Sequence, residues 1–434
     1  MDVGVETATE RELLLAQYAS LSKQIADARL RRAKLEPITV EHKRVFDRLQ
    51  EISPRRPRRL RVGEAPVLAV EHIAERDALH ELREDWDELL ERVDNYSPFV
   101  TWEWWWPWLE CYGDTCRANV IVLRDQQGKL QGGLPLALPR RGTDRARFLG
   151  YGCGPDPAYL SPPIADSEAL TAILQAIGEL PVRGLLWEQC PVDERLTEIF
   201  RAVGSAGWQT ALHIRRHYVH GELPNTWEAY VAGVASKNRR SALRHQFERL
   251  TVAWGEPRLE VHREWNDETL ALVERMADYS IQRRRYSDCR SRYEDKLFRH
   301  CLSRTASHFA ERGWMRLMTI RVGEELSAAL LGWAYRGTFF AYQIGTHPQH
   351  QELGLGHCVI SHAIRSAIVE GLERFEMLGQ SSQFKRSYFA GLTPAATVLF
   401  GPDHSEHWFD LGSGAFRQAV AARYREFRAR FLTR

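Results

Sequence analysis

Residues 315–347 contain three consecutive apolar segments that are separated by two short turns. The stretch MRLMTIRVGEELSAALLGWAYRGTFFAYQIGTH turns at Val322-Gly323-Glu324 and at Arg336-Gly337. Segments of this length, rich in β-branched and aromatic residues and bounded by glycine, predict three consecutive β-strands. A helix is predicted from Gly354 to Glu370, and RFEMLG after it predicts another strand. Strands followed by a helix and a further strand restrict this region to a mixed α/β fold.

The chain of 434 residues is long enough for two or three domains. Hydrophobic heptads predict a helical or coiled-coil extension over residues 1–52, and five arginines with two prolines indicate a linker over 53–65. Residues 66–222 and 223–400 repeat a similar succession of hairpins, helices and strands, so two tandem, related α/β domains are expected. Residues 401–434 form a C-terminal segment that ends in a basic amphipathic helix.

The overall charge gives no argument about partners, because 59 basic residues balance 57 acidic ones. The acidic N-terminus has no apolar core of a secretory signal, and no uncharged apolar run approaches a membrane span. The seven cysteines are scattered and form no C-x-x-C pair. These features predict a cytoplasmic protein with reduced thiols. The histidines His347, His350, His357 and His362 match no metal pattern, so no metal site is expected. Peripheral contact with an anionic surface through the arginine clusters stays open.

The stretch HQELGLGH places Gln351, Gly354 and Gly356 in the spacing Q-x-x-G-x-G. It lies between a predicted strand and a predicted helix. Glycines let the backbone approach a ligand closely, and the free N–H groups of the first helical turn favour an anion such as pyrophosphate. The motif G-x-G-x-x-G is not completed and no Walker A sequence is present, which disfavours a dinucleotide-binding domain and a nucleoside triphosphatase.

This motif resembles the coenzyme A pyrophosphate loop of GNAT-type N-acyltransferases, and three other stretches agree with the resemblance. SKNRRSALRHQFERL (236–250) resembles the basic helix that opens the CelD-like branch of that superfamily. LGQSSQFKRSYF (378–389) resembles the closing glycine, lysine and aromatic residue of the branch, and SPFVTWEWWWPWLECYGD (97–114) resembles its aromatic-rich opening. Fem-type peptidoglycan aminoacyltransferases, which carry two GNAT-like halves, are relatives of this branch. The resemblance covers roughly residues 66–400 and implies mixed, mostly antiparallel sheets flanked by helices.

The first half departs from the family pattern. An Asp-Tyr pair is expected after a glycine turn, but GCGPDPAYLSPPI separates Asp156 from Tyr159. The first half also lacks Q-x-x-G-x-G, so it is expected to bind no acyl cofactor. Its tryptophans could stack on a sugar, but the helical spacing of Trp102, Trp105 and Trp106 favours buried packing.

The resemblance implies direct transfer of an acyl group from acetyl-CoA or another acyl-CoA to an amine or hydroxyl acceptor. The acceptor would be a small molecule or a glycan, with polysaccharide or cell-envelope biosynthesis as the expected setting. Backbone groups of Ile344, Gly345 and Thr346 are expected to polarise the thioester carbonyl. The pyrophosphate is assigned to Gln351, Gly354, Leu355 and Gly356. Catalytic candidates are Lys385, Tyr342 and Tyr388, and acceptor-binding candidates are Lys237, Arg240 and Arg244.

Two other functions remain open. One is a Fem-like transferase that uses aminoacyl-tRNA and binds it through Arg55 to Arg61, Arg283 to Arg285 and the C-terminal helix. The other is a non-catalytic GNAT-like scaffold. In that case the N-terminal helices would recruit a partner, and they could also associate with a second copy of the chain.

Overall fold

The computed structural model describes residues 68–401, apart from the short internal segments 94–96, 141–144, 151–156, 183, 194–195, 197–198, 200–201, 204–207, 235–236 and 286–290. The predicted helical extension, the arginine-rich linker and the basic C-terminal helix lie outside the described residues. The self-association and most of the anion contacts that the sequence predicts for these segments therefore also lie outside the described residues.

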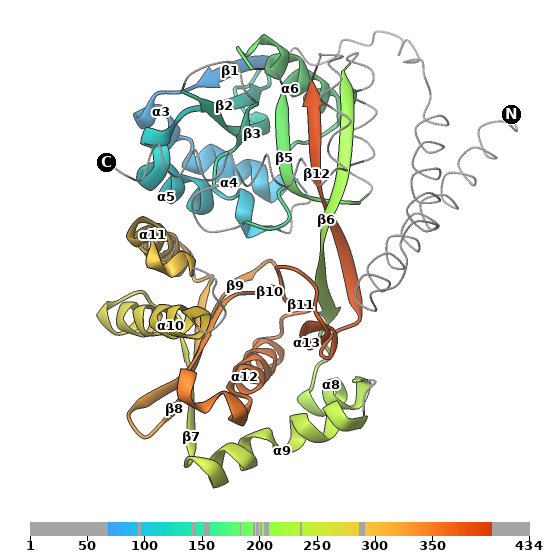
Figure 1. The fold of residues 1–434 in the computed structure, drawn as a ribbon. Helices are drawn as coiled ribbons and strands as arrows, with labels where there is room; N and C mark the ends of the chain where they lie inside the picture. The colour runs from blue at the N-terminus through green and yellow to red at the C-terminus, as the bar shows by residue number, and fades with distance from the viewer. Residues whose placement is uncertain are drawn as a thin grey trace, which may run out of the picture.

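The first half builds a four-stranded antiparallel sheet in the order β1-β2-β3-β4, covered by helices (Figure 1). The β2–β3 hairpin and the strand and helix before it follow the sequence prediction. Its elements are β1 (Ala69–Ile73), α3 (Arg76–Glu81), α4 (Arg83–Arg92), α5 (Trp102–Tyr112), β2 (Cys116–Arg124), β3 (Leu130–Pro139), β4 (Arg147–Phe148) and α6 (Ser167–Glu179).

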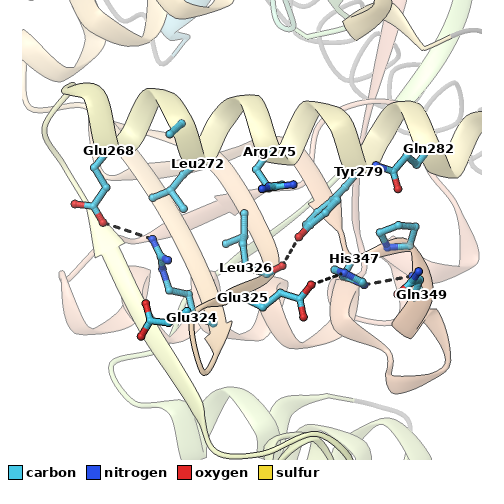
Figure 2. Close-up of a pocket in the computed structure, with 13 residues that line it drawn as sticks. Glu268, Leu272, Arg275, Tyr279, Gln282, Glu324, Glu325, Leu326, His347 and Gln349 are labelled. Atoms are coloured by element: carbon cyan, nitrogen blue, oxygen red, sulfur yellow. Dashed lines mark hydrogen bonds and ion pairs between the residues drawn. The ribbon is translucent and has the colours of Figure 1, made fainter.

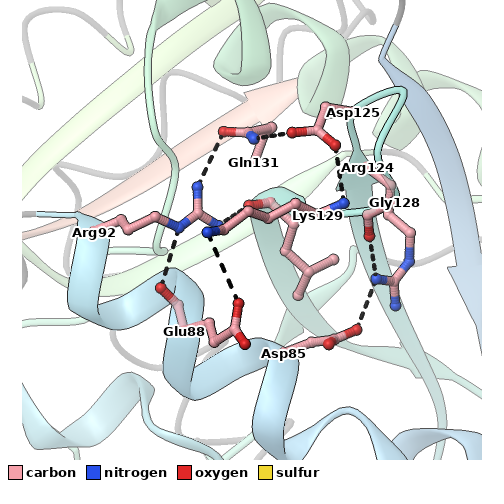
Figure 3. A network of polar contacts seen from close by, with 9 residues as sticks. Asp85, Glu88, Arg92, Arg124, Asp125, Gly128, Lys129 and Gln131 are labelled. Carbon is pink, nitrogen blue, oxygen red and sulfur yellow. Dashed lines mark hydrogen bonds and ion pairs between the residues drawn. The ribbon is translucent and has the colours of Figure 1, made fainter.

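A polar network fixes the turn of the β2–β3 hairpin against α4 (Figure 3). The Asp125 carboxylate accepts hydrogen bonds from the backbone N–H groups of Gln127 and Lys129 at 3.0 and 2.9 Å. Arg124 donates to the Gly128 carbonyl at 2.8 Å and to Asp85 of α4 at 2.7 Å. Aspartate is favoured in such turns because its short side chain bonds to the backbone a few residues on.

The tryptophan-rich helix α5 is buried, which confirms the packing interpretation. All five tryptophans of the cluster are at most 6% exposed. Trp102 stacks on Trp106 with ring centroids 5.2 Å apart, and Trp104 donates to the Gly150 carbonyl at 3.3 Å. No side chain of this cluster therefore offers a free stacking surface for a sugar.

The second sheet has eight strands in the order β5-β12-β6-β11-β10-β9-β8-β7. All neighbouring strands are antiparallel except β10 and β11, which are parallel. The three consecutive strands predicted from the sequence are β8, β9 and β10. The strands are β5 (Leu185–Pro191), β6 (Gln209–Glu222), β7 (Pro257–His262), β8 (Met315–Val322), β9 (Glu325–Tyr335), β10 (Thr338–Thr346), β11 (Arg374–Glu376) and β12 (Gly391–Gly401).

Strands β6 and β12 join the two halves. Figure 1 shows them as long neighbouring strands that run from the upper half into the lower half. They pair from Gly391↔His220 to Gly401↔Gln209, and β12 also pairs with β5. Strand β12, from the end of the described chain, therefore lies between two strands of the first half. The two halves share one sheet.

Helices cover both faces of the lower part of this sheet. Helices α10 and α11 lie on one face, and α12 lies on the other with α9 beside it (Figure 1). Helices α8 and α9 are separate, because α8 ends at Gly233 and Val234 after it has extended backbone. The helices are α8 (Trp227–Gly233), α9 (Lys237–Ala253), α10 (Asp267–Arg285), α11 (Lys296–Glu311), α12 (Leu355–Val369) and α13 (Gln383–Arg386).

Replacing Gly133 of β3 with alanine should destabilise the first half. An added Cβ would lie 2.4 and 2.6 Å from ring atoms of Trp86, which has no exposed surface. Because such overpacking forces the ring or the strand to move, we expect the free energy of unfolding to fall by about 2 kcal/mol in urea titrations. Gly233→Ala is the control, since nothing lies within 4 Å of its added Cβ. An equal loss in both variants would contradict the steric explanation.

Candidate functional site

The site begins where β10 and β11 separate. These parallel strands pair only from Thr338↔Arg374 to Phe340↔Glu376. Immediately afterwards β10 has a register shift between Ala341 and Gln343, and it continues to Thr346 paired with β9. A bulge of this kind bends a strand and ends regular pairing on one side. In the described part of the chain, residues 343–346 continue past the end of the β10–β11 pairing and form an open strand edge.

The direction of the backbone amides along this edge follows from the antiparallel ladder with β9. His347 donates its N–H to the Ser327 carbonyl at 2.9 Å. Because such bonds alternate along an antiparallel pair, the amide of Gly345 also faces β9, whereas the amides of Ile344 and Thr346 face the open edge. Gly345 has another role: a Cβ there would meet the Met276 carbonyl at 2.5 Å, so this glycine lets α10 approach the sheet.

The glycine loop connects the open edge to the N-terminus of α12. Gln351 lies in a short 3₁₀ segment, Pro348–Leu353, and Gly354 follows with a φ of 67° as the N-cap of α12. This left-handed backbone favours glycine. The amides of Leu355 and Gly356 belong to the first helical turn and have no acceptor within the helix. A Cβ on Gly356 would lie 3.9 Å from Thr346 and 4.0 Å from Ile344, so the loop lies directly beside the strand end.

Helix α9 adds positive charge near this helix N-terminus. Burial, with smaller effects of Arg239 and Arg249, lowers the pKa of His357, one residue beyond Gly356, to about 4. The Arg239 guanidinium also lies 4.1 Å from the ring centroid of Tyr388. The sequence interpretation missed both arginines. Helical periodicity could have found Arg239, because it shares a face with three buried residues, Leu243, Gln246 and Leu250.

The three acceptor-binding candidates on α9 are placed differently. Arg240 donates to the Val234 carbonyl at 2.6 Å and so holds the connection between α8 and α9. Arg244 is exposed, and Lys237 is the first residue of the helix.

Helix α13 carries Lys385, and Tyr388, two residues after the end of this helix, lies against α12. The Tyr388 hydroxyl lies 2.7 Å from Nδ1 of His357, and Phe384 packs on the same imidazole with ring centroids 4.5 Å apart. Lys385 donates a hydrogen bond from Nζ to the Leu378 carbonyl. Burial, with a smaller effect of Arg216, lowers the pKa of Lys385 to about 8. Burial raises the pKa of Tyr388 far above its ordinary value, so this phenol keeps its proton.

Tyr342 lies apart from this group. Its ring packs against Phe99, Trp104 and Trp333 with centroid distances of 5.9, 5.7 and 5.4 Å. Tyr342 belongs to the core shared with the first half, whereas Tyr388 belongs to the core under α12. The two tyrosines named as acid candidates therefore lie on opposite sides of the sheet.

His357 should make the protein sensitive to acid. Its pKa is about 4 in the folded protein and 6.5 ordinarily, so the folded state binds a proton less readily than the unfolded state. The resulting stability is present above pH 6.5 and is lost as pH falls towards 4. Between these limits, urea titrations should show wild type losing about 1 kcal/mol more than His357→Gln. Equal pH slopes for the two proteins would contradict this expectation.

A separate groove lies on the α10 side of the sheet (Figure 2). It has a volume of about 550 Å³ and lies between α10, the β8–β9 turn and the residues that follow β10. His347 bonds to Glu325 at 2.9 Å, and the Tyr279 hydroxyl donates to the Leu326 carbonyl at 2.6 Å. These residues form the inner wall of the groove. The groove lies on the face of the sheet opposite the start of α12.

Among the described residues, no cluster of histidine, cysteine or acidic side chains could hold a metal ion. In that same part of the chain, no helix has the length and apolar character needed to cross a bilayer.

Comparisons with known proteins agree with this geometry. A protein-family model described as acetyltransferase (GNAT) domain matches residues 237–386, which run from α9 through α13. The solved structure of FemX is similar over 76% of this chain and 96% of its own, at 10% identity and a TM-score of 0.54. A conserved protein of unknown function from Bacteroides thetaiotaomicron is similar over 77% and 100%, at 10% identity and a TM-score of 0.50.

A tandem GNAT protein from the clavulanic acid biosynthesis pathway is similar over 78% of this chain and 100% of its own, at 12% identity and a TM-score of 0.41. No curated protein matches the chain significantly in sequence. The predicted GNAT-type domain is confirmed over residues 237–386, and FemX shares the fold of the longer chain. The assignment to the CelD-like branch stays a prediction.

Proposed function

We propose that this chain, whose residues 237–386 form a GNAT-type transferase domain, transfers an acyl group from acyl-CoA directly to an amine or hydroxyl acceptor. The observation that carries this proposal is the open edge of β10, which leads through Gly354 and Gly356 into the free amides of α12. A small-molecule or glycan acceptor of polysaccharide or envelope biosynthesis agrees with the CelD-like sequence resemblance.

The residues present fit the cofactor. The amides of Leu355 and Gly356, with Arg239 and Arg249 nearby, suit a pyrophosphate. Gly356 has no atom within 3.9 Å of an added Cβ, so a ligand can approach the backbone there. Bound acyl-CoA would supply an activated thioester. The amides of Ile344 and Thr346 face the open edge of β10, where they could donate hydrogen bonds to the thioester carbonyl.

The remaining roles in the transfer are assigned to side chains. Tyr388 is buried and hydrogen-bonds to His357, and its raised pKa makes it a weak acid, so we assign it the positioning of His357 and not proton transfer to a leaving thiolate. Lys385 is half-buried and held by the Leu378 carbonyl, so it can orient an anionic acceptor. Tyr342 is packed among aromatic rings and is assigned no step.

Calorimetric titration of the full chain with acetyl-CoA tests the proposal. We expect saturable heat, with thermal stabilisation that grows with ligand concentration. Longer acyl-CoAs and free coenzyme A in the same titration separate recognition of the acyl group from recognition of the nucleotide. Absence of binding by every acyl-CoA would refute the cofactor assignment.

A Fem-like use of aminoacyl-tRNA is the second candidate, because FemX shares the two-part fold. It predicts tRNA binding that weakens steeply as salt rises, since each neutralised phosphate releases counterions. Acyl-CoA binding together with a flat salt response to tRNA would exclude it. A non-catalytic scaffold predicts that neither ligand binds and that a partner protein co-purifies.

A further inference from the structure

Glu376 is a carboxylic acid without exposed surface at the point where β10 and β11 separate. Its Oε1 accepts a hydrogen bond from Arg374 Nε at 2.9 Å and forms an ion pair with Arg374 Nη2 at 2.7 Å. Its Oε2 accepts a hydrogen bond from the Tyr159 hydroxyl at 2.7 Å. Burial raises the pKa of Glu376 to about 7 in spite of these partners. Acidic side chains are rarely buried completely unless they are paired, and here Arg374 and Tyr159 supply the partners.

Tyr159 comes from the first half of the chain, 217 residues before Glu376. Its ring lies 4.6 Å from the ring of Tyr218, and the Tyr218 hydroxyl donates to Gln189. Tyr159 and Gln189 have φ angles of 50° and 59°, and Leu378, two residues after Glu376, has 44°. Such backbone in non-glycine residues persists only where the surrounding structure holds it, and it is common at functional sites.

The segment that follows Glu376 holds Lys385. The backbone N–H of Met377 donates to the Val219 carbonyl at 2.8 Å, which extends the pairing with β6. The next carbonyl, that of Leu378, accepts the hydrogen bond from Lys385 Nζ. Gly379 is so close that an added Cβ would lie 3.0 Å from this nitrogen. The place of Lys385 therefore depends on the path of the chain directly after Glu376.

We propose that Tyr159 and Glu376 are positioning residues of the transfer site. The hydrogen bond between them fixes the end of β11, and the end of β11 fixes the carbonyl that holds Lys385. The first half thereby contributes a residue to a site formed mainly by the second half. The role in transfer rests on the proposed function, but the effect on Lys385 does not.

The charged groups around this connection come from two strands. Arg374 of β11 and Glu222 of β6 act on Glu376, and Arg216 of β6 acts on Lys385. None of these three is changed in the test below, so their influence is constant among the variants.

The variants Tyr159→Phe and Glu376→Gln each remove part of the connection and keep the shape of the side chain. The pH dependence with which acetic anhydride labels Lys385, measured by peptide mass spectrometry, gives the midpoint of its titration. We expect a midpoint near 8 in wild type. In both variants it should rise by about one pH unit, because the lysine becomes better solvated.

Tyr279→Phe is the matched control, since it also loses a buried tyrosine hydrogen bond, 2.6 Å to the Leu326 carbonyl of β9. Its midpoint should equal that of wild type. Circular dichroism identifies any variant that does not fold, and Glu376→Gln carries the test if Tyr159→Phe fails. An unchanged midpoint in the folded variants overturns the proposal.

Enzyme kinetics give a second readout. Tyr159→Phe should lower kcat by about tenfold and leave the KM for acyl-CoA within about twofold, because the connection positions Lys385 and not the first-turn amides of α12. A changed KM at unchanged kcat contradicts the positioning role. If wild type binds no acyl-CoA, the proposed function fails, and the labelling midpoints still decide whether Tyr159 and Glu376 position Lys385.

Discussion

Replacing Gly356 with glutamate should weaken the binding of acetyl-CoA by about 100-fold or more. The first-turn amides of α12 attract anions, and a carboxylate at this position would repel a pyrophosphate from them. The side chain would also extend from a Cβ that already lies 3.9 Å from Thr346 and 4.0 Å from Ile344. It would therefore fill the space between the loop and the open strand edge. Isothermal titration calorimetry measures the loss.

Two further substitutions separate charge from size. Gly356→Ala should bind within about threefold of wild type, because its Cβ makes only ordinary contacts. Gly356→Gln has the size of glutamate without the charge, so its affinity should lie between the other two. Wild-type affinity in Gly356→Glu would show that the loop is only a turn and that it holds no anion.

Replacing Lys385 with methionine should lower kcat/KM for the acceptor by about 100-fold. Methionine keeps the length of the side chain and removes the cation that would orient an anionic acceptor. The pKa of Lys385 is lowered to about 8, so the charged form is complete below that pH and is lost above it. Wild-type kcat/KM should therefore fall as pH rises through about 8.

Lys385→Arg is the control for this pH dependence. Arginine keeps a positive charge that does not titrate in this range, so the fall at alkaline pH should disappear even where the overall rate is lower. Steady-state kinetics between about pH 6 and about pH 10 measure both effects. An identical alkaline fall in wild type and Lys385→Arg would show that another group is responsible.

The sequence predicted the central part of the fold because that part depends on local patterns. Apolar segments and glycine turns define β8, β9 and β10, and the loop at Gly354 needs the left-handed backbone that glycine adopts readily. The helical spacing of the tryptophans in α5 likewise indicated burial. Each of these patterns lies within a single strand, turn or helix, where the strand and helix periodicities can be recognised directly from neighbouring residues.

Side-chain partners that are distant in sequence could not be predicted in this way. Charge clustering on α9 suggested Arg240 and Arg244, but the packing of the helix places Arg239 beside Tyr388. The sequence assigns the backbone of Gly345 to the thioester carbonyl, but the register with β9 turns the Gly345 amide towards β9. Tyr342 and Tyr388 have equal chemistry in the sequence, yet the sheet lies between them.

The sequence alone thus determined the meander, the glycine loop and the helix after it, since neighbouring residues encode their geometry. Only the tertiary structure decided that β12 lies between β5 and β6, that β10 and β11 separate after Phe340, and that Tyr159 bonds to Glu376. The physical reason is that these contacts form when segments far apart in sequence share one sheet. Strand order and register are set by the packing of the whole core, which no local pattern contains.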